Sequence, residues 1–244
     1  MASGALEPFH SLRNKKLNIG ILIFPRMDQI DFTGPFEVLS RLPEATVHVL
    51  ARESGPILDH KGLILTPQKM LAAAPPLDIL QIPGGPGQEA LMEDEPVLSL
   101  IRRQMSAGKV VFSVCTGALI CGAAGVLKGR RATTHWAAFD LLSYFGATPV
   151  NERVVIDGNL ISAAGITSGI DGALKLASLV RSDEIAEQIQ LDIQYAPEPP
   201  FDSGTPTRAP RAVLDAVTAG YRSLTDARRR TAERVRARLD LKTL

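Results

Sequence analysis

The chain has 244 residues, 45% of them hydrophobic, which is enough for one large or two small domains with a sizeable core. Its 27 Lys and Arg against 26 Asp and Glu give a net charge of +1, so no strong overall field favours nucleic acid or a membrane. The two cysteines lie close together, are not a disulfide framework, and fit a reducing compartment.

No segment approaches the ~20 consecutive apolar residues of a membrane span. Residues 1–16 lack the apolar core of an export signal, and they are expected to form a loose leader. The sequence therefore predicts a cytoplasmic protein with no membrane partner.

The first part of the chain alternates predicted strands and helices. Short runs of β-branched and aliphatic residues predict strands; they cover residues 17–24, 46–51, 62–65 and 77–82. A helix is expected to begin near Pro35, with Thr33 or Gly34 as its cap. A second, amphipathic helix is expected over residues 95–108.

Two segments that follow predicted strands contain candidate functional residues. Asp31 lies between Ile30 and Phe32, and it is either a functional carboxylate or a turn or capping residue. The glycines of Pro83-Gly84-Gly85-Pro86-Gly87 form either an oxyanion hole or a plain turn. This segment lacks the glycine spacing of a dinucleotide site and the lysine of a P-loop.

Residues 109–127, KVVFSVCTGALICGAAGVL, predict a buried strand, a sharp turn and an apolar helix. A nucleophile at such a turn stands at the carboxyl edge of the sheet, where the helix start favours a thiolate. Cys115 is therefore a candidate nucleophile, although a buried cysteine is often inert packing. Cys121 lies inside the helix pattern and is expected to be a core residue.

The second part of the chain contains His135, which either faces the site or is structural, before a helix that ends near residue 145. Residues 153–163 predict a β-hairpin about Asp157-Gly158. A long helix is expected over residues 170–195, capped by Thr167 or Ser168, before a proline-rich break. A basic helix is expected over residues 210–239 with a solvated charged face, and without a second helix it offers no helix-turn-helix.

Alternating strands and helices predict a flavodoxin-like, doubly wound α/β sandwich with a mostly parallel central sheet. The motifs IPGG (82–85), SVCTGAL (113–119), ATTHW (132–136) and ITSGID (166–171) resemble the PfpI-like, class I glutamine-amidotransferase-like superfamily. DFTGP (31–35) and YAPEPPF (195–201) resemble its isonitrile hydratase branch. We expect the leader at 1–16, the α/β domain at 17–205 and a C-terminal helix at 206–244 packed on or extending that domain.

The resemblance implies catalytic roles for Cys115 as nucleophile, Asp31 as acid and base, and Thr116. It also implies that a further set of residues contacts the oxyanion or the substrate: Gly84, Gly85, His135, Ile166 and Thr167. The oxyanion donors would be the N–H groups of Gly85 and Thr116. Peptidase-like members carry His directly after the cysteine, and Thr116 in that place argues against peptidase activity.

The implied reaction hydrates an isonitrile to an N-substituted formamide through a cysteine thioimidate, and it needs no metal and no organic cofactor. The resemblance also implies a homodimer. Alternatives are a ligand-sensing regulator without its DNA-binding domain, since few residues follow Thr205, or a PfpI-like stress protein or hydrolase of another small electrophile.

Overall fold

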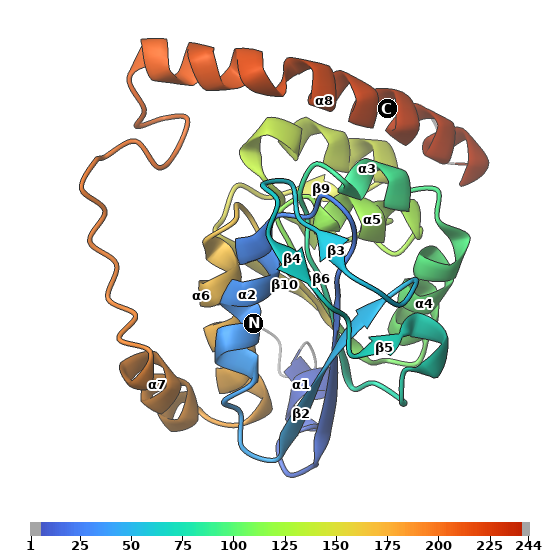
Figure 1. Ribbon diagram of the computed structural model, residues 1–244, viewed down its shortest axis with the longest axis vertical. Coiled ribbons are helices and arrows are strands. Elements are labelled where there is room, and N and C mark those ends of the chain that lie inside the picture. The colour runs from blue at the N-terminus through green and yellow to red at the C-terminus, as the bar shows by residue number, and fades with distance from the viewer. Residues whose placement is uncertain (1–5, 241–244) are drawn as a thin grey trace.

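The computed structural model describes residues 6–240 as a central sheet between two layers of helices (Figure 1). The seven-stranded sheet has the order β10-β11-β7-β6-β1-β2-β5 and is parallel except for the antiparallel β10–β11 pair. Its strands are β1 (Leu17–Leu22), β2 (Ala45–Ala51), β5 (Lys69–Met70), β6 (Ile79–Ile82), β7 (Val110–Val114), β10 (Val154–Asp157) and β11 (Leu160–Ala163). The prediction of a doubly wound α/β sandwich is confirmed.

The helices form two groups, one on each side of the sheet (Figure 1). One group contains α1 (Glu7–His10), α2 (Gln29–Leu39), α6 (Ser168–Val180) and α7 (Asp183–Asp192). The other contains α3 (Gln88–Leu91), α4 (Glu95–Ser106), α5 (Gly117–Ala123), the 3-10 helix η3 (Trp136–Phe145) and α8 (Arg211–Arg238). Short elements complete the chain: β3 (Ile57–Leu58), β4 (Ile64–Leu65), the 3-10 helix η2 (Leu71–Ala73), β8 (Arg131–Ala132) and β9 (Thr148–Pro149).

The middle strands β6 and β7 are buried along their whole length, because helices cover both faces of the sheet. From β1 the chain moves to β2 on one side and to β6, β7 and β11 on the other. Such a reversal of strand order leaves a crevice at the carboxyl ends of the strands. The loops after β1, β6, β7 and β11 therefore meet at one edge of the sheet. None of the helices within residues 6–240 is long and apolar enough to cross a membrane.

Helix α2 begins six residues before the expected start at Pro35, because Asp28 caps it and accepts a hydrogen bond from the Ile30 N–H at 3.1 Å. Pro35 lies inside the helix, where it cannot donate to the carbonyl of Asp31. The side chain of Gln81 on β6 supplies the missing donor at 3.0 Å. Asp31 is therefore in the first turn of α2 rather than in a loop.

The expected helix over residues 170–195 is two helices, α6 and α7. Arg181 leaves the helical conformation, and the Ser182 side chain accepts from the Ile185 N–H to start α7. The Arg181 guanidinium donates to the carbonyls of Leu12 and Pro43, which fixes this break against the N-terminal segment. The apolar periodicity alone did not reveal the cap.

Three smaller expectations also differ from the structure. The strand expected at 62–65 is β4, which pairs only with β3 in a separate sheet, and the helix before residue 145 is a 3-10 helix. The leader forms α1 within residues 6–16 and buries Phe9, while residues 1–5 lie outside the described part. The hairpin of β10 and β11 is confirmed, with Val154 opposite Ala163.

Candidate active site

Cys115 stands at a strained turn between β7 and α5. Its φ of 54° lies in the left-handed region, which is unusual for a residue other than glycine and is typical of functional sites. Its N–H donates to the Ala163 carbonyl at 3.0 Å, and its carbonyl accepts from the Thr134 hydroxyl at 2.7 Å. These bonds hold the backbone on both sides of the turn. The turn also requires Gly117, where a Cβ would lie 2.2 Å from the Ile82 carbonyl oxygen.

Asp31 is completely buried beside Cys115. Its Oδ2 accepts from the Gly84 N–H at 2.8 Å. Its Oδ1 has no hydrogen-bond partner among the described residues. A buried carboxyl with one unsatisfied oxygen requires an explanation, because leaving such an atom unpaired is costly. Oδ1 is the carboxyl oxygen that is available to carry and exchange a proton.

Asp31 and Cys115 both resist ionisation. Burial first, and then the charge of Asp28, raise the pKa of Asp31 to about 8, against the opposing effects of the Gly84 N–H, the Cys115 thiol and Arg228. Burial and the charge of Asp31 raise the pKa of the Cys115 thiol, against the Thr116 N–H and Arg228. The two groups titrate as a pair, so apparent values belong to both. The pair keeps its protons at neutral pH and becomes a single anion above it.

The glycine turn after β6 holds the side chains of the site. The Gly85 N–H donates to Thr116 Oγ1 at 3.1 Å, just as the Gly84 N–H donates to Asp31. This differs from the expectation that Gly85 presents its N–H to the substrate as an oxyanion donor. A Cβ on Gly84 would lie 2.5 Å from Thr116 N, so only glycine fits between Thr116 and Asp31.

A cavity of about 260 Å³ opens onto Cys115 and Thr116. His135 and Ile166, both predicted site residues, line it. Thr167, another predicted substrate contact, is exposed, does not line this cavity and accepts from the Arg153 guanidinium at 3.2 Å. It is the N-cap residue of α6, and the α6 start directs it to the surface. The cavity is lined by Asp28, His60, Lys61, Gly85, Pro86, Cys115, Thr116, His135, Ile166, Gly220, Tyr221, Leu224 and Arg228.

His135 lines this cavity with an uncharged imidazole ring. Burial, followed by the charge of Arg228, lowers the pKa of His135 to about 4. Its Nδ1 accepts from the Ala137 N–H at 3.3 Å, which leaves the proton on Nε2. The ring lies beside those of Trp136 and Tyr221, with centroids 5.4 and 5.3 Å away.

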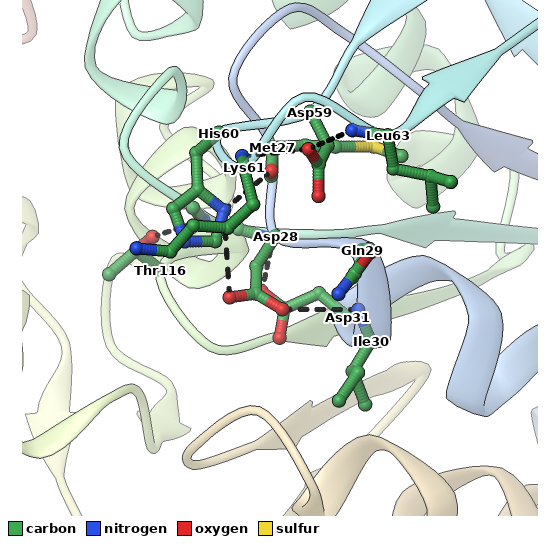
Figure 2. A network of polar contacts seen from close by, with 12 residues as sticks. Met27, Asp28, Gln29, Ile30, Asp31, Asp59, His60, Lys61, Leu63 and Thr116 are labelled. Carbon is green, nitrogen blue, oxygen red and sulfur yellow. Dashed lines mark hydrogen bonds and ion pairs between the residues drawn. The ribbon is translucent and has the colours of Figure 1, made fainter.

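Two residues of the loop 59–63, His60 and Lys61, also line the cavity. Asp59 Oδ1 accepts from the Lys61 and Leu63 N–H groups at 2.7 and 2.8 Å, which closes a tight turn. This turn directs His60 toward Asp28, with His60 Nδ1 3.9 Å from Asp28 Oδ2 (Figure 2). Within residues 6–240, no group of three or more His, Cys, Asp or Glu side chains could hold a metal ion.

Helix α8 closes the cavity with Gly220, Tyr221, Leu224 and Arg228. The sequence reasoning expected a solvated basic face here and missed these residues. The spacing of three and four between Tyr221, Leu224 and Arg228 places these three on one helical face, and this was the available signal. Arg228 is 2% exposed, unlike its neighbours Arg229 and Arg230.

The similarity of this chain to known proteins extends over nearly its whole length. The chain is 47% identical over 226 residues to isonitrile hydratase of Pseudomonas putida, covering 93% of this chain and 99% of that protein. A THiJ/PfpI family protein of Pseudomonas syringae superposes with a TM-score of 0.86 at 34% identity, covering 91% of this chain and 92% of that one.

More distant structures cover less of this chain. Drosophila melanogaster DJ-1beta superposes with a TM-score of 0.69 at 24% identity, and all of it covers 75% of this chain. The DJ-1/PfpI family profile matches residues 17–179, which contain Asp31, Cys115 and Thr116 but end before α8. The chain belongs to the DJ-1/PfpI family.

Proposed function

We propose that this protein is an isonitrile hydratase, which adds water to R–N≡C and releases the formamide R–NH–CHO. The observation that carries the proposal is a thiol and a protonated carboxyl, Cys115 and Asp31, together beside a small cavity. The similarity to the Pseudomonas putida enzyme supports it, because that similarity extends over 93% of the chain.

The reaction starts from the single anion of the pair, which holds one proton. In the first half-reaction that proton is on Asp31, and the Cys115 thiolate attacks the terminal carbon of the isonitrile and forms a C–S bond. The electron pair left on that carbon accepts a proton from Asp31, which yields the thioimidate R–N=CH–S–Cys. The raised pKa of Asp31 suits this role, because an acid must still hold its proton near neutral pH. Asp31 is left as a carboxylate.

In the second half-reaction, water attacks the thioimidate carbon. Asp31 takes one proton from the water and passes it to the nitrogen, which gives R–NH–CH(OH)–S–Cys. The hydroxyl then loses its proton to Asp31 as the C–S bond breaks. The formamide leaves, and the thiolate and protonated Asp31 are restored. Thr116 lines the cavity, and in this mechanism its hydroxyl orients the water.

The direct test is incubation of the purified protein with an alkyl isonitrile, with the formamide followed by mass spectrometry. The proposal predicts multiple turnovers by the parent and a loss of several orders of magnitude in Cys115→Ala. Cys121→Ala is the matched control, because Cys121 is a buried core residue of α5 outside the cavity lining. Absence of formamide with isonitriles small enough for the cavity would contradict the proposal.

The proposal includes a homodimer in the cytoplasm that binds no specific nucleic acid. The superfamily resemblance supports the dimer. The two free thiols support a cytoplasmic location, and the near-neutral net charge supports the absence of specific nucleic-acid binding. Light scattering is expected to give about twice the chain mass of 26.2 kDa. A sequence-specific DNA footprint would instead favour a regulator.

A further inference from the structure

Arg228 is a buried cation that reaches the active site from outside the family domain. It lies on α8, beyond residue 179 where the family profile ends. Arginine is almost never fully buried without a partner, because removal of the charge from water is costly. The burial of Arg228 therefore calls for compensating contacts.

The hydrogen bonds of Arg228 connect three parts of the site. Its Nε donates to Gln88 Oε1 at 2.9 Å, and its Nη2 donates to the Gly85 carbonyl at 2.9 Å and to Thr116 Oγ1 at 3.3 Å. All three acceptors are neutral. Within residues 6–240, no carboxylate lies within ion-pair distance of its guanidinium, so these bonds do not neutralise the charge.

The charged and titratable groups that face Arg228 come from five parts of the chain. Glu89 on α3 accepts a hydrogen bond from Thr231, and Tyr221 is on α8 itself. His135 is neutral, as its lowered pKa indicates. The remaining two are Cys115 and Asp31, whose ionised forms Arg228 stabilises. The single anion that this pair forms is a buried charge for Arg228 to balance.

The Thr116 hydroxyl is oriented by two donors. Its oxygen accepts from the Gly85 N–H and from Arg228 Nη2. A hydroxyl has two acceptor sites and one hydrogen, so both acceptor sites are occupied. The hydrogen of Thr116 is then free only to donate, toward the cavity or the Cys115–Asp31 pair. Without Arg228 the hydroxyl could rotate and accept from water instead.

We propose that Arg228 is a positioning residue of this active site, which fixes Thr116 as a hydrogen-bond donor and balances the anion of the Cys115–Asp31 pair. Its effect on turnover rests on the proposed function, whereas its effect on the reactivity of Cys115 does not. Helix α8 would then be part of the catalytic unit, and the central domain alone would lack this group.

The test compares Arg228→Gln with Arg230→Gln, an exposed arginine on the same helix. The rate of Cys115 alkylation by iodoacetamide is measured from about pH 5 to about pH 10, together with kcat and KM for an isonitrile. Arg228→Gln is expected to shift the alkylation midpoint upward by about one pH unit, because loss of the cation disfavours the anion. We expect kcat to fall about 10-fold to about 100-fold, with KM changed less.

Arg228→Lys separates the balancing of the anion from the positioning of Thr116. It also replaces Arg228→Gln as the test variant if the glutamine variant does not fold. It keeps the charge but cannot reproduce the fork of donors, so the alkylation midpoint should stay near that of the parent while kcat falls. An unchanged midpoint and kcat in folded Arg228→Gln, or parental kcat in Arg228→Lys, would overturn the proposal. If the parent hydrates no isonitrile, the proposed function fails, and the alkylation profile still decides the role of Arg228.

Discussion

Asp31 Oδ2 accepts a hydrogen bond from the Gly84 N–H at 2.8 Å, which joins the first turn of α2 to the turn after β6. The same glycine lies against Thr116, the residue after Cys115. The Asp31 carboxyl and the backbone and hydroxyl of Thr116 are therefore positioned around one residue without a side chain.

Gly84→Ala is expected to disrupt this arrangement. The added Cβ would lie 2.5 Å from Thr116 N and 2.9 Å from Asp31 Oδ2, so backbone or carboxyl must shift. Overpacking of this kind costs about 1–3 kcal/mol of stability, and a shift of about 1 Å at the site can cost ~100-fold in rate. Thermal melts and formamide assays would check both effects. Gly204→Ala is the control, because a Cβ there meets nothing within 4 Å.

Asp31→Asn is expected to lose isonitrile turnover by ~10²–10⁴-fold, because the amide cannot cycle a proton. Cys115 should still react with iodoacetamide, since removal of a neighbouring negative charge favours the thiolate. Asp94→Asn is the matched control, because Asp94 caps α4 outside the cavity lining and asparagine also caps helices well, and it should retain activity within a few-fold. If Asp31→Asn is as active as Asp94→Asn, Asp31 is structural.

The stability of the protein should depend on pH through Asp31. Its pKa is raised from 3.8 to about 8 in the folded state, so the folded state holds this proton more tightly than the unfolded chain. The contribution of Asp31 to stability is fully present below about pH 4 and is lost as pH rises toward about 8.

Asp31→Asn removes this dependence. We expect the melting temperature of Asp31→Asn minus that of the parent to be more positive at pH 8 than at pH 4. Taking this difference also cancels the effect of His135, which is the same in both proteins and whose lowered pKa destabilises the fold at acid pH. An equal difference in melting temperature at both pH values would show that Asp31 has an ordinary pKa.

The α8 wall should select substrates by size. Leu224 lines the cavity of about 260 Å³, and Leu224→Trp is expected to fill part of it. The variant should raise KM for a bulky isonitrile, such as cyclohexyl isonitrile, at least several-fold more than for methyl isonitrile. Val217→Trp, at an exposed position on the same helix, should leave both values near those of the parent. Equal changes in KM for both isonitriles would show that the R group of the substrate does not bind beside Leu224.

The sequence predicted the parts of the site that follow strands. Cys115 and the glycines 84 and 85 come directly after buried strands, and the carboxyl ends of parallel strands meet at one edge. Asp31 was singled out by its apolar flanks, although its place in a helix was missed, because the capping role of Asp28 and the Gln81 contact were not anticipated.

Arg228 could not be found in this way. It lies 143 residues from Gly85 in the sequence, and only the packing of α8 on η3, α3 and α5 brings them together. Its basic neighbours suggested a solvated helix, and composition does not distinguish the one buried arginine from the exposed ones. Thr167 shows the converse case, because it belongs to a motif near the site, yet its place at the start of α6 leaves it exposed and outside the cavity lining.

The most direct test of the central claim is to quench the parent during turnover of an isonitrile and to map the covalent adduct by mass spectrometry. The account predicts an adduct with the mass of the intact isonitrile on Cys115, present during turnover and absent after the substrate is consumed. Formamide production without this adduct, or with undiminished rate in Cys115→Ala, would contradict it.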